Sequence, residues 1–365
     1  MSQTAPDVAI VGVGATDYYR RGQSWPRTMT ELAGDAILAA VAEAGLSVTD
    51  IDGFAYYSEA GAGYGDKFDT ALFMETLGIP EVTFSATLTS GGGGAAGSIG
   101  LARAAILAGD ANVVVTVMAL QQARQRLGSV FAAAPSNPIN SFLQPSGLSG
   151  PGHLMSVLTR RHMHDYGTRR EAFAEIAISQ RANAANRPKA LKRDPITVED
   201  YFNARMIADP LCLLDFCLET DGAIAVITTS VDRAKDLRQP PVPVIAAAHG
   251  GSKDWGRAFG WFGMPQEEFA SSGHAAVAQH LFRRAGVGPE DIDVALLYDH
   301  FSPMVLMQLE DYGFCKKGEG GDFVESGAIR YQGGSIPVTV NAGAALVSIT
   351  GLPLSPLVLR ACEPR

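Results

Sequence analysis

The sequence predicts a layered α/β fold built from two similar halves, with a loop-rich segment inserted into the first half. Three observations predict it: a repeat offset by 241 positions, apolar runs of Val, Ile and Ala without alternation, and a loop-rich stretch between the two copies. Apolar runs without alternation are typical of strands covered on both faces. A chain of 365 residues is long enough for a large core or two lobes.

The repeat relates Ala44–Tyr57, AGLSVTDIDGFAYY, to Ala285–Tyr298, AGVGPEDIDVALLY. Each copy reads Ala-Gly, then Asp-Ile-Asp, then an apolar run that ends in Tyr. A helical pattern precedes each copy and stops at its glycine, which is a common C-terminal cap. A strand-like run comes before each helix, VAIVGVG from Val8 and VPVIAAAHG from Val242. Each half is therefore predicted to contain a strand, a helix and a second strand.

Two further apolar runs, NVVVTVMAL and DGAIAVITTS, are predicted as additional strands of the first half. Between them lies a stretch that is loop-rich at first and then helical and charged. We therefore predict three parts: an N-terminal half formed by 1–119 and 216–235, an inserted loop domain at 120–215, and a C-terminal half at 236–365.

Composition and charge exclude several classes of protein. The net charge of -9 argues against nucleic acid as a partner, because an acidic surface repels phosphates. The apolar runs are too short to cross a bilayer and the first residues do not resemble a signal peptide, so we expect a cytoplasmic protein. The four cysteines are too few for a disulfide framework and lack metal-ligand spacing, so we expect reduced core residues.

Four consecutive glycines precede a predicted helix in LTSGGGGAAGSIGLARAAILAG. Gly92, Gly94 and Gly97 match the GxGxxG pattern of dinucleotide-binding proteins, and VGVGATD at the N-terminus matches half of it. The next strand ends without the acidic residue that would bind a ribose, and neither run is followed by Lys-Ser or Lys-Thr. Two interpretations remain. The bare N–H groups at the helix start could bind negative charge, or glycine could allow close packing of a buried helix.

Four motifs follow one another in the later part of the chain: NRPKALKRDPITVEDYFNARMIADPLCLLDFCLETDGAIAV, YDHFSP, YGFCKKGEGGDFVESG and GGSIPVTVNAGAAL. Together with the duplicated halves and the insertion, they resemble the thiolase superfamily, in the branch similar to sterol-carrier-protein thiolases. The resemblance spans nearly the whole chain. It implies the thiolase fold, in which two layered halves of the αβαβα type carry a loop domain.

The positions that carry catalysis in thiolases are replaced here. A thiolase needs a nucleophilic cysteine at the start of the helix after the glycine-rich turn, and that position falls at or near Gly92. The first cysteine of the chain is Cys212. The family histidine of an HD or HE motif corresponds to Tyr298, and the late GHP histidine corresponds to Gly351 or Leu352. An acyl-cysteine of the thiolase type is therefore not expected.

This pattern resembles the thiolase-like aldolases that shorten steroid side chains. The resemblance implies retro-aldol cleavage of a β-hydroxyacyl-CoA to a ketone and a shorter acyl-CoA, and a small DUF35 partner with an OB-fold and a zinc ribbon. Such a cleavage needs a base for the hydroxyl proton and stabilisation of a thioester enolate, but no nucleophile. We expect no cofactor besides the CoA of the substrate, and any zinc is expected in the partner.

The residues in YDHF are the candidate acid–base groups. Tyr298 occupies the position of a family catalytic residue, and on a strand His300 would share its face while Asp299 pointed the other way. Tyrosine is a weak base, so it would need a stabilised phenolate or a proton relay. The structural alternative is that Tyr298 only ends a strand at the core edge, as its repeat counterpart Tyr57 would.

For the enolate, the N–H groups of Gly92 and Gly93 are the candidate oxyanion hole. Asn341 and Gly343, in the loop NAGAAL, are candidate substrate-binding residues, although Asn341 could equally shape the turn. His162 and His164 have the spacing of metal ligands but no third ligand nearby in sequence, so we interpret them as surface or core histidines.

Two other functions remain open at this stage. Loss of the catalytic residues is also expected of a silent scaffold subunit, and an acyltransferase could use another nucleophile such as Ser90. Retention of Tyr298 and His300 favours a catalytic function over a scaffold role. Thr83–Thr89 has the alternation of a strand that could pair between two copies, so we expect a homodimer, bound to two partner chains.

Overall fold

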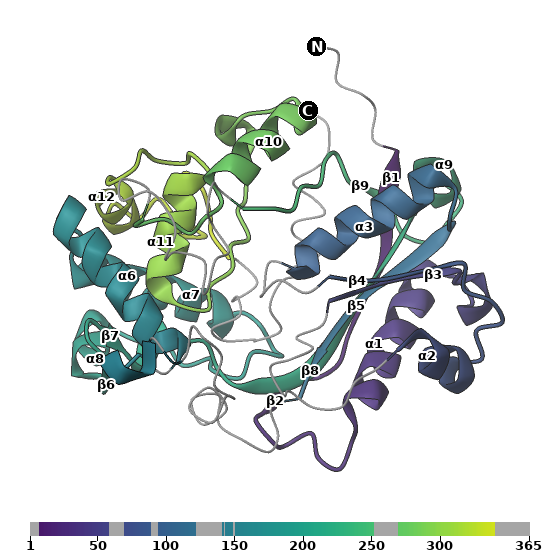
Figure 1. Ribbon diagram of the computed structural model, residues 1–365, viewed down its shortest axis with the longest axis horizontal. Helices are drawn as coiled ribbons and strands as arrows, with labels where there is room; N and C mark the ends of the chain where they lie inside the picture. The colour runs from purple at the N-terminus through teal and green to yellow at the C-terminus, as the bar shows by residue number, and fades with distance from the viewer. Residues whose placement is uncertain are drawn as a thin grey trace.

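The computed structural model describes residues 7–57, 69–88, 94–121, 141, 143–148, 150–251 and 269–339. Figure 1 shows a twisted sheet with helices on both of its faces, beside a group of helices that includes α6, α7, α11 and α12. The predicted α/β class is confirmed.

The strands are β1 (Val8–Ala15), β2 (Tyr19–Arg20), β3 (Gly53–Tyr57), β4 (Phe84–Leu88), β5 (Val113–Leu120), β6 (Met206–Ala208), β7 (Leu211–Cys212), β8 (Thr220–Ser230) and β9 (Val242–Pro243). The helices are α1 (Met29–Ala44), α2 (Thr70–Leu77), α3 (Gly94–Ala108), α6 (Pro151–Tyr166), α7 (Arg170–Ala185), α8 (Val198–Asn203), α9 (Val231–Ala234), α10 (Ala275–Ala285), α11 (Ser302–Asp311) and α12 (Gly320–Glu325).

The main sheet has the strand order β4-β3-β5-β8-β1-β9, and β2 pairs with β8 beside this row. Strand β3 runs parallel to β4 and β5, whereas β8 runs antiparallel to both β5 and β1. The two apolar runs predicted as further strands of the first half are therefore neighbours at the centre of the sheet. The predicted strand at Thr83–Thr89 is β4, at the edge, and Thr89 lies outside the described residues.

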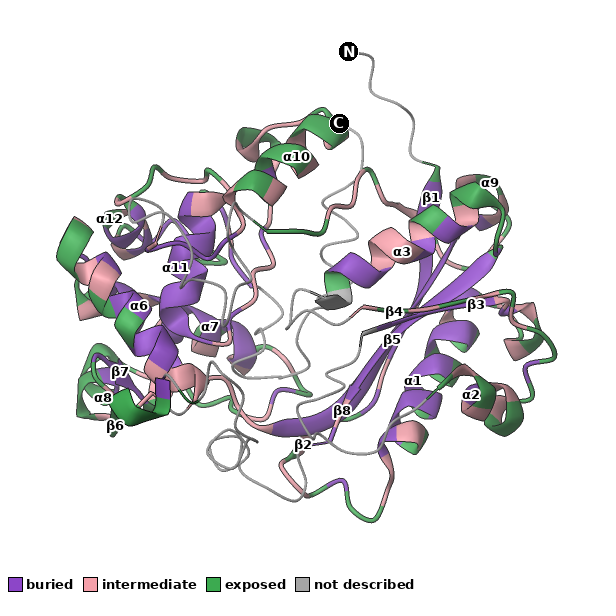
Figure 2. Cartoon of the chain, viewed as in Figure 1, coloured by how far each residue is buried: buried purple, intermediate pink, exposed green. Residues whose placement is uncertain are grey.

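Both faces of the sheet are covered, which explains the apolar runs without alternation. Helix α1 packs on β1, β5 and β8, and α3 packs on the other face, against β3, β4 and β5 (Figure 1). Figure 2 shows the central strands as almost entirely buried, and ten of the eleven residues of β8 are buried. The sheet is therefore the middle layer of this half.

The glycines of VGVG serve close packing of a helix on a strand. A Cβ atom on Gly12 would overlap the carbonyl oxygen of Ala40, and one on Gly14 would overlap that of Ala36. Only glycine permits this approach of α1 to β1. This close approach gives a structural cause for the partial match of VGVG to a dinucleotide-binding pattern.

The two repeat copies have the same local structure at their start. Gly45 and Gly286 cap α1 and α10 in the left-handed conformation, with φ of 75° and 70°. A single 3₁₀ turn follows in each, and the carboxylates of Asp50 and Asp291 accept a hydrogen bond from the N–H three residues earlier, at 2.8 and 2.9 Å. The helix ends predicted from the repeat are confirmed.

Two strands predicted for the C-terminal half differ from the structure. After β9 the N–H of Val244 still donates to the carbonyl of Val8 at 2.9 Å, but residues 244–251 form no strand. The apolar run that ends at Tyr298 forms one bridge, between Ala295 and Val338, rather than a strand. Other residues of this half, 252–268 and 340–365, lie outside the described residues.

The helices of the predicted loop domain pack against the later part of the chain. Helix α7 contacts α11 and α12, and a shared apolar core includes Phe173, Ile176, Leu306 and Val324. The division of the chain into three parts remains a prediction. Among the described helices, none is long and apolar enough to cross a membrane.

Candidate active site

Tyr298 lies in the irregular segment that leads directly into α11. Its backbone N–H donates to Oε1 of Gln308 at 3.1 Å, and Nε2 of Gln308 donates to its carbonyl oxygen at 2.6 Å. Two residues on, the carbonyl of His300 accepts a hydrogen bond from the N–H of Cys217 at 3.1 Å. The backbone of this segment is therefore held between α11 and the residues that precede β8.

The side chains of Tyr298 and His300 lie together, as predicted. Their rings stack with centroids 4.2 Å apart and an interplanar angle of 16°. Because the segment is irregular at these residues, the pairing does not depend on strand geometry. Both side chains are half-buried, while Asp299 between them is buried.

Burial, together with the nearby His274, lowers the pKa of His300 to about 3. Nδ1 of His300 is buried and has no hydrogen-bond partner within the described part of the chain. The imidazole is therefore neutral at neutral pH, and it binds a proton too weakly to retain one there. Of the two stacked rings, the imidazole of His300 is therefore a poor proton acceptor at neutral pH.

Asp299 is buried and lies near Cys217, and its predicted direction away from Tyr298 stays a prediction. Burial, together with the negative charge of Asp299, raises the pKa of the Cys217 thiol to about 12. The rings of Tyr298 and His300 stack on each other, and Asp299 lies near Cys217.

The other candidate residues, Gly92, Gly93, Asn341 and Gly343, lie outside the described residues, as do Ser90, Gly351 and Leu352. Helix α3 begins at Gly94, the last glycine of the run, in agreement with the predicted helix.

The chain leading toward Asn341 begins beside the segment of Tyr298. Thr339 donates its N–H to the carbonyl of Ala295 at 2.8 Å, and it has a φ of 49°, which is uncommon for a β-branched residue. The side-chain amide of Asn183, on α7, donates to the carbonyls of Val338 and Thr339. This turn is therefore tied both to the Tyr298 segment and to a helix of the predicted loop domain.

His274, which lies near His300, and His249, which lies near His274, were missed by the sequence analysis. Nδ1 of His274 lies 2.9 Å from the hydroxyl of Ser272, and the side chain of His249 packs against Gly97 in the second turn of α3. Burial lowers the pKa of His274, which the charge of Asp311 partly opposes. The run Ser-Ser-Gly-His directly before a helix was the only sequence signal for this group.

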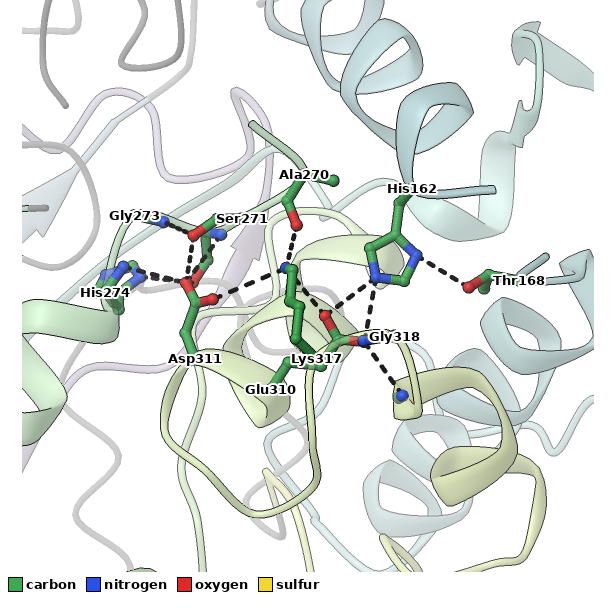
Figure 3. Close-up of polar contacts among 12 residues, drawn as sticks. His162, Thr168, Ala270, Ser271, Gly273, His274, Glu310, Asp311, Lys317 and Gly318 are labelled. Atoms are coloured by element: carbon green, nitrogen blue, oxygen red, sulfur yellow. Dashed lines mark hydrogen bonds and ion pairs between the residues drawn. The ribbon is translucent and has the colours of Figure 1, made fainter. Parts of the chain in front are cut away.

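A buried ionic network lies beside this histidine group, and Figure 3 shows its side chains between α6 and α11. The carboxylate of Glu310 is fully buried and accepts from Nε2 of His162 at 3.0 Å and from Nζ of Lys317 at 3.0 Å. The backbone N–H groups of Gly318 and Gly320 donate to the same carboxylate at 3.0 and 3.1 Å. The glycines in KKGEGG thus expose donors to a buried acid.

His162 and His164 do not form a metal site together. His162 is fully buried and lies between Glu310 and the hydroxyl of Thr168, which is 2.9 Å from its Nδ1. The side chain of His164 is 84% exposed and pairs with Asp165. Among the described residues no group of His, Cys, Asp and Glu could hold a metal ion. The interpretation as core and surface histidines is confirmed.

The surroundings of the described cysteines disfavour their thiolate form. Cys212, Cys217 and Cys315 are free thiols, and burial raises the pKa of each, to about 12 for the latter two. Since the thiolate is the nucleophile, such thiols are inert at neutral pH. Cys362 lies outside the described residues.

Comparisons with known proteins agree with these features. A family model for the thiolase C-terminal domain matches residues 264–353. The chain is 39% identical to the "17-hydroxy-3-oxo-4-pregnene-20-carboxyl-CoA lyase" of Mycobacterium tuberculosis, over 92% of this chain and 86% of that protein. It is 35% identical to the "Steroid side-chain-cleaving aldolase" of Thermomonospora curvata, over 94% of this chain and 86% of that protein.

A solved structure, the "Ltp2-ChsH2(DUF35) aldolase", matches with a TM-score of 0.84 and 34% identity, over 95% of this chain and 87% of that one. Its similarity extends across both the sheet half and the helices of the predicted loop domain. The thiolase fold expected from the motifs is therefore confirmed. The chain belongs to the thiolase superfamily, in its group of thiolase-like aldolases that act on acyl-CoA.

Proposed function

We propose that this aldolase cleaves a β-hydroxyacyl-CoA whose acyl part is a steroid side chain. The observation that carries the proposal is the 39% identity to the lyase, spread over 92% of the chain. In the substrate that gives the lyase its name, the hydroxyl-bearing carbon adjoins the carbon that carries the carboxyl-CoA group. The hydroxyl is therefore β to the thioester, as a retro-aldol reaction requires.

The proposed reaction begins when a base removes the proton of the β-hydroxyl group. The oxygen forms a carbonyl, the bond between the α and β carbons breaks, and its electron pair becomes a thioester enolate. A proton then returns to the α carbon and gives the shorter acyl-CoA. No nucleophile, oxidant or cofactor beyond the CoA of the substrate enters this balance, in accordance with the inert thiols of the described cysteines.

In this proposal Tyr298 is the group that moves the hydroxyl proton. The stacked His300 supports the choice, because a neutral imidazole whose pKa is about 3 leaves the phenol as the better candidate. The N–H groups of Gly92 and Gly93 would stabilise the enolate oxygen, and Asn341 with Gly343 would contact the thioester.

The reaction can be tested with a panel of β-hydroxyacyl-CoAs that includes a steroid side-chain thioester. We expect release of a ketone and a shorter acyl-CoA, and we expect this turnover to survive thiol alkylation. Mass spectrometry should detect no acyl group on a cysteine during turnover. An acylated cysteine on the reaction path would support an acyltransferase instead, and a chain without turnover on any member would support a scaffold role.

The assembly that we propose is a cytoplasmic homodimer bound to two DUF35 chains that carry any zinc. The similar solved structure contains a DUF35 protein, and edge strand β4 could pair with its counterpart in a second copy. Light scattering at micromolar concentration should give the mass of a dimer for the chain alone, and a larger complex when a DUF35 protein is added. A chain that stays monomeric and does not bind the DUF35 protein would contradict both the dimer and the complex.

A further inference from the structure

Gln308 holds both backbone polar groups of Tyr298. It lies on α11, ten positions after the tyrosine, and only 4% of its surface is exposed. Its Oε1 accepts from the N–H of Tyr298, and its Nε2 donates to the carbonyl of the same residue. A neighbouring strand would ordinarily supply such a pair of hydrogen bonds, and here a side chain supplies it.

The orientation of the Gln308 amide is determined by a third hydrogen bond. Nε2 also donates to the carbonyl of Met304, one turn earlier on α11, at 2.9 Å. Both N–H groups of the amide therefore donate to carbonyl oxygens, and the amide oxygen accepts from the N–H of Tyr298. A flipped amide would place its oxygen against two carbonyls and its nitrogen against an N–H, so only one orientation fits.

These contacts have an energetic consequence for the candidate site. A buried backbone N–H or C=O that loses its partner costs about 1–3 kcal/mol, so the segment moves when the partner is removed. A displacement of Tyr298 by about 1 Å is enough to lower a catalytic rate strongly. The stacking on His300 fixes the ring plane but provides no hydrogen bond to the backbone.

We propose that Gln308 is the residue that positions Tyr298 for proton transfer, through its backbone rather than through its hydroxyl. The inference rests on the proposed function, since it requires that Tyr298 moves the proton. Gln308 contacts no reacting atom in this role. Its removal therefore affects the catalytic step and leaves the binding of the CoA thioester unchanged.

The test is a double-mutant cycle with Gln308→Met and Tyr298→Phe in the full chain with its DUF35 partner. Methionine has a similar length and volume but lacks the amide. We expect Gln308→Met to lower kcat about tenfold or more with KM changed by less than about twofold. In the Tyr298→Phe background the same substitution should lower kcat by less than about twofold, because the hydroxyl that it misplaces is already absent.

Gln180 offers a matched control. It is also a helical glutamine with 4% exposure, and its Nε2 has no hydrogen-bond partner among the residues that the structure describes. Gln180→Met should leave kcat and KM within about twofold of the parent. If Gln308→Met does not fold, Gln308→Glu takes its place in the cycle, since it keeps the acceptor for the Tyr298 N–H and loses both donors.

Each outcome decides one of the two claims. Equal losses of kcat from the Gln308 substitution in the parent and in the Tyr298→Phe background, or a change confined to KM, would overturn the positioning role. A Tyr298→Phe enzyme that retains nearly full activity would instead overturn the proposed role of Tyr298. A loss of kcat from Gln308→Met that occurs only when the Tyr298 hydroxyl is present supports the positioning role of Gln308.

Discussion

Tyr298→Phe should lower kcat for carbon–carbon cleavage on the order of a hundredfold, while the free energy of unfolding changes by about 1 kcal/mol or less. Phenylalanine keeps the ring that stacks on His300 at 4.2 Å, and the hydrogen bonds from Gln308 involve only the backbone. The substitution therefore removes the hydroxyl and little else. Measuring kcat together with the melting temperature separates a chemical role from a structural one.

Tyr312 is a suitable control for this prediction. It also stacks on a histidine, His274, with ring centroids 6.0 Å apart. Burial raises the pKa of its hydroxyl, so this phenol stays protonated. Tyr312→Phe should leave kcat within a few-fold of the parent. If Tyr298→Phe is stable and equally active, the assignment of the base is wrong and His300 becomes the next candidate.

Local features of the fold could be predicted from the sequence because their causes are local. Gly45 and Gly286 were expected as helix caps, and both adopt the left-handed conformation that favours glycine. Strands β5 and β8 likewise followed from long, uniform apolar patterns. The irregular segment before Tyr298 did not, since apolar composition alone cannot distinguish a strand from an extended chain that a side chain holds.

The candidate site was only partly predictable. Its stacked pair, Tyr298 and His300, was expected from the alternation of side chains on a strand, although the segment that carries the two rings is irregular. Gln308 was missed, since nothing in the spacing of a helical glutamine indicates which backbone it bonds. His274 was missed because its neighbours come from separate parts of the chain. Such contacts depend on tertiary packing, which a single sequence does not display.

The glycines illustrate the same limit. Gly12 and Gly14 match half of a dinucleotide-binding pattern, but glycine is required there because the backbone of α1 lies too close for a side chain. In KKGEGG, Gly318 has a φ of 87° and donates its N–H to Glu310. A Cβ on Gly320 would press on the same carboxylate. In both cases the residue that explains the glycine is distant in sequence.

The second large effect that we predict concerns the stability of the fold and the buried network around Glu310. Glu310→Gln should lower the free energy of unfolding by about 3 kcal/mol at neutral pH. The neutral amide would leave the charge of Lys317 without its closest carboxylate, and it would place an NH₂ group among four donors, from His162, Lys317, Gly318 and Gly320. Urea unfolding of the parent and the variant measures the difference.

The same network predicts how this difference depends on pH. Burial raises the pKa of Glu310, but the hydrogen bond from His162 and the charge of Lys317 lower it by more, so its folded-state pKa lies below the ordinary value. A group of this kind stabilises the fold above its unfolded pKa of about 4.3, and the contribution is lost as the pH falls through the folded value. The gap between parent and Glu310→Gln should therefore be full at about pH 7 and shrink on acidification below about pH 4.

Glu319→Gln is the control, because it removes the same charge from a side chain that is 58% exposed and only pairs with Lys316 at 3.7 Å. It should change the free energy of unfolding by no more than about 0.5 kcal/mol at either pH. An equal urea midpoint for Glu310→Gln and the parent at neutral pH would show that the network adds nothing to stability. A gap that persists unchanged in acid would show that it acts through packing rather than through charge. Since Glu310 lies two positions after Gln308 on α11, loss of the network also removes the anchor at the C-terminal end of the helix that holds Tyr298.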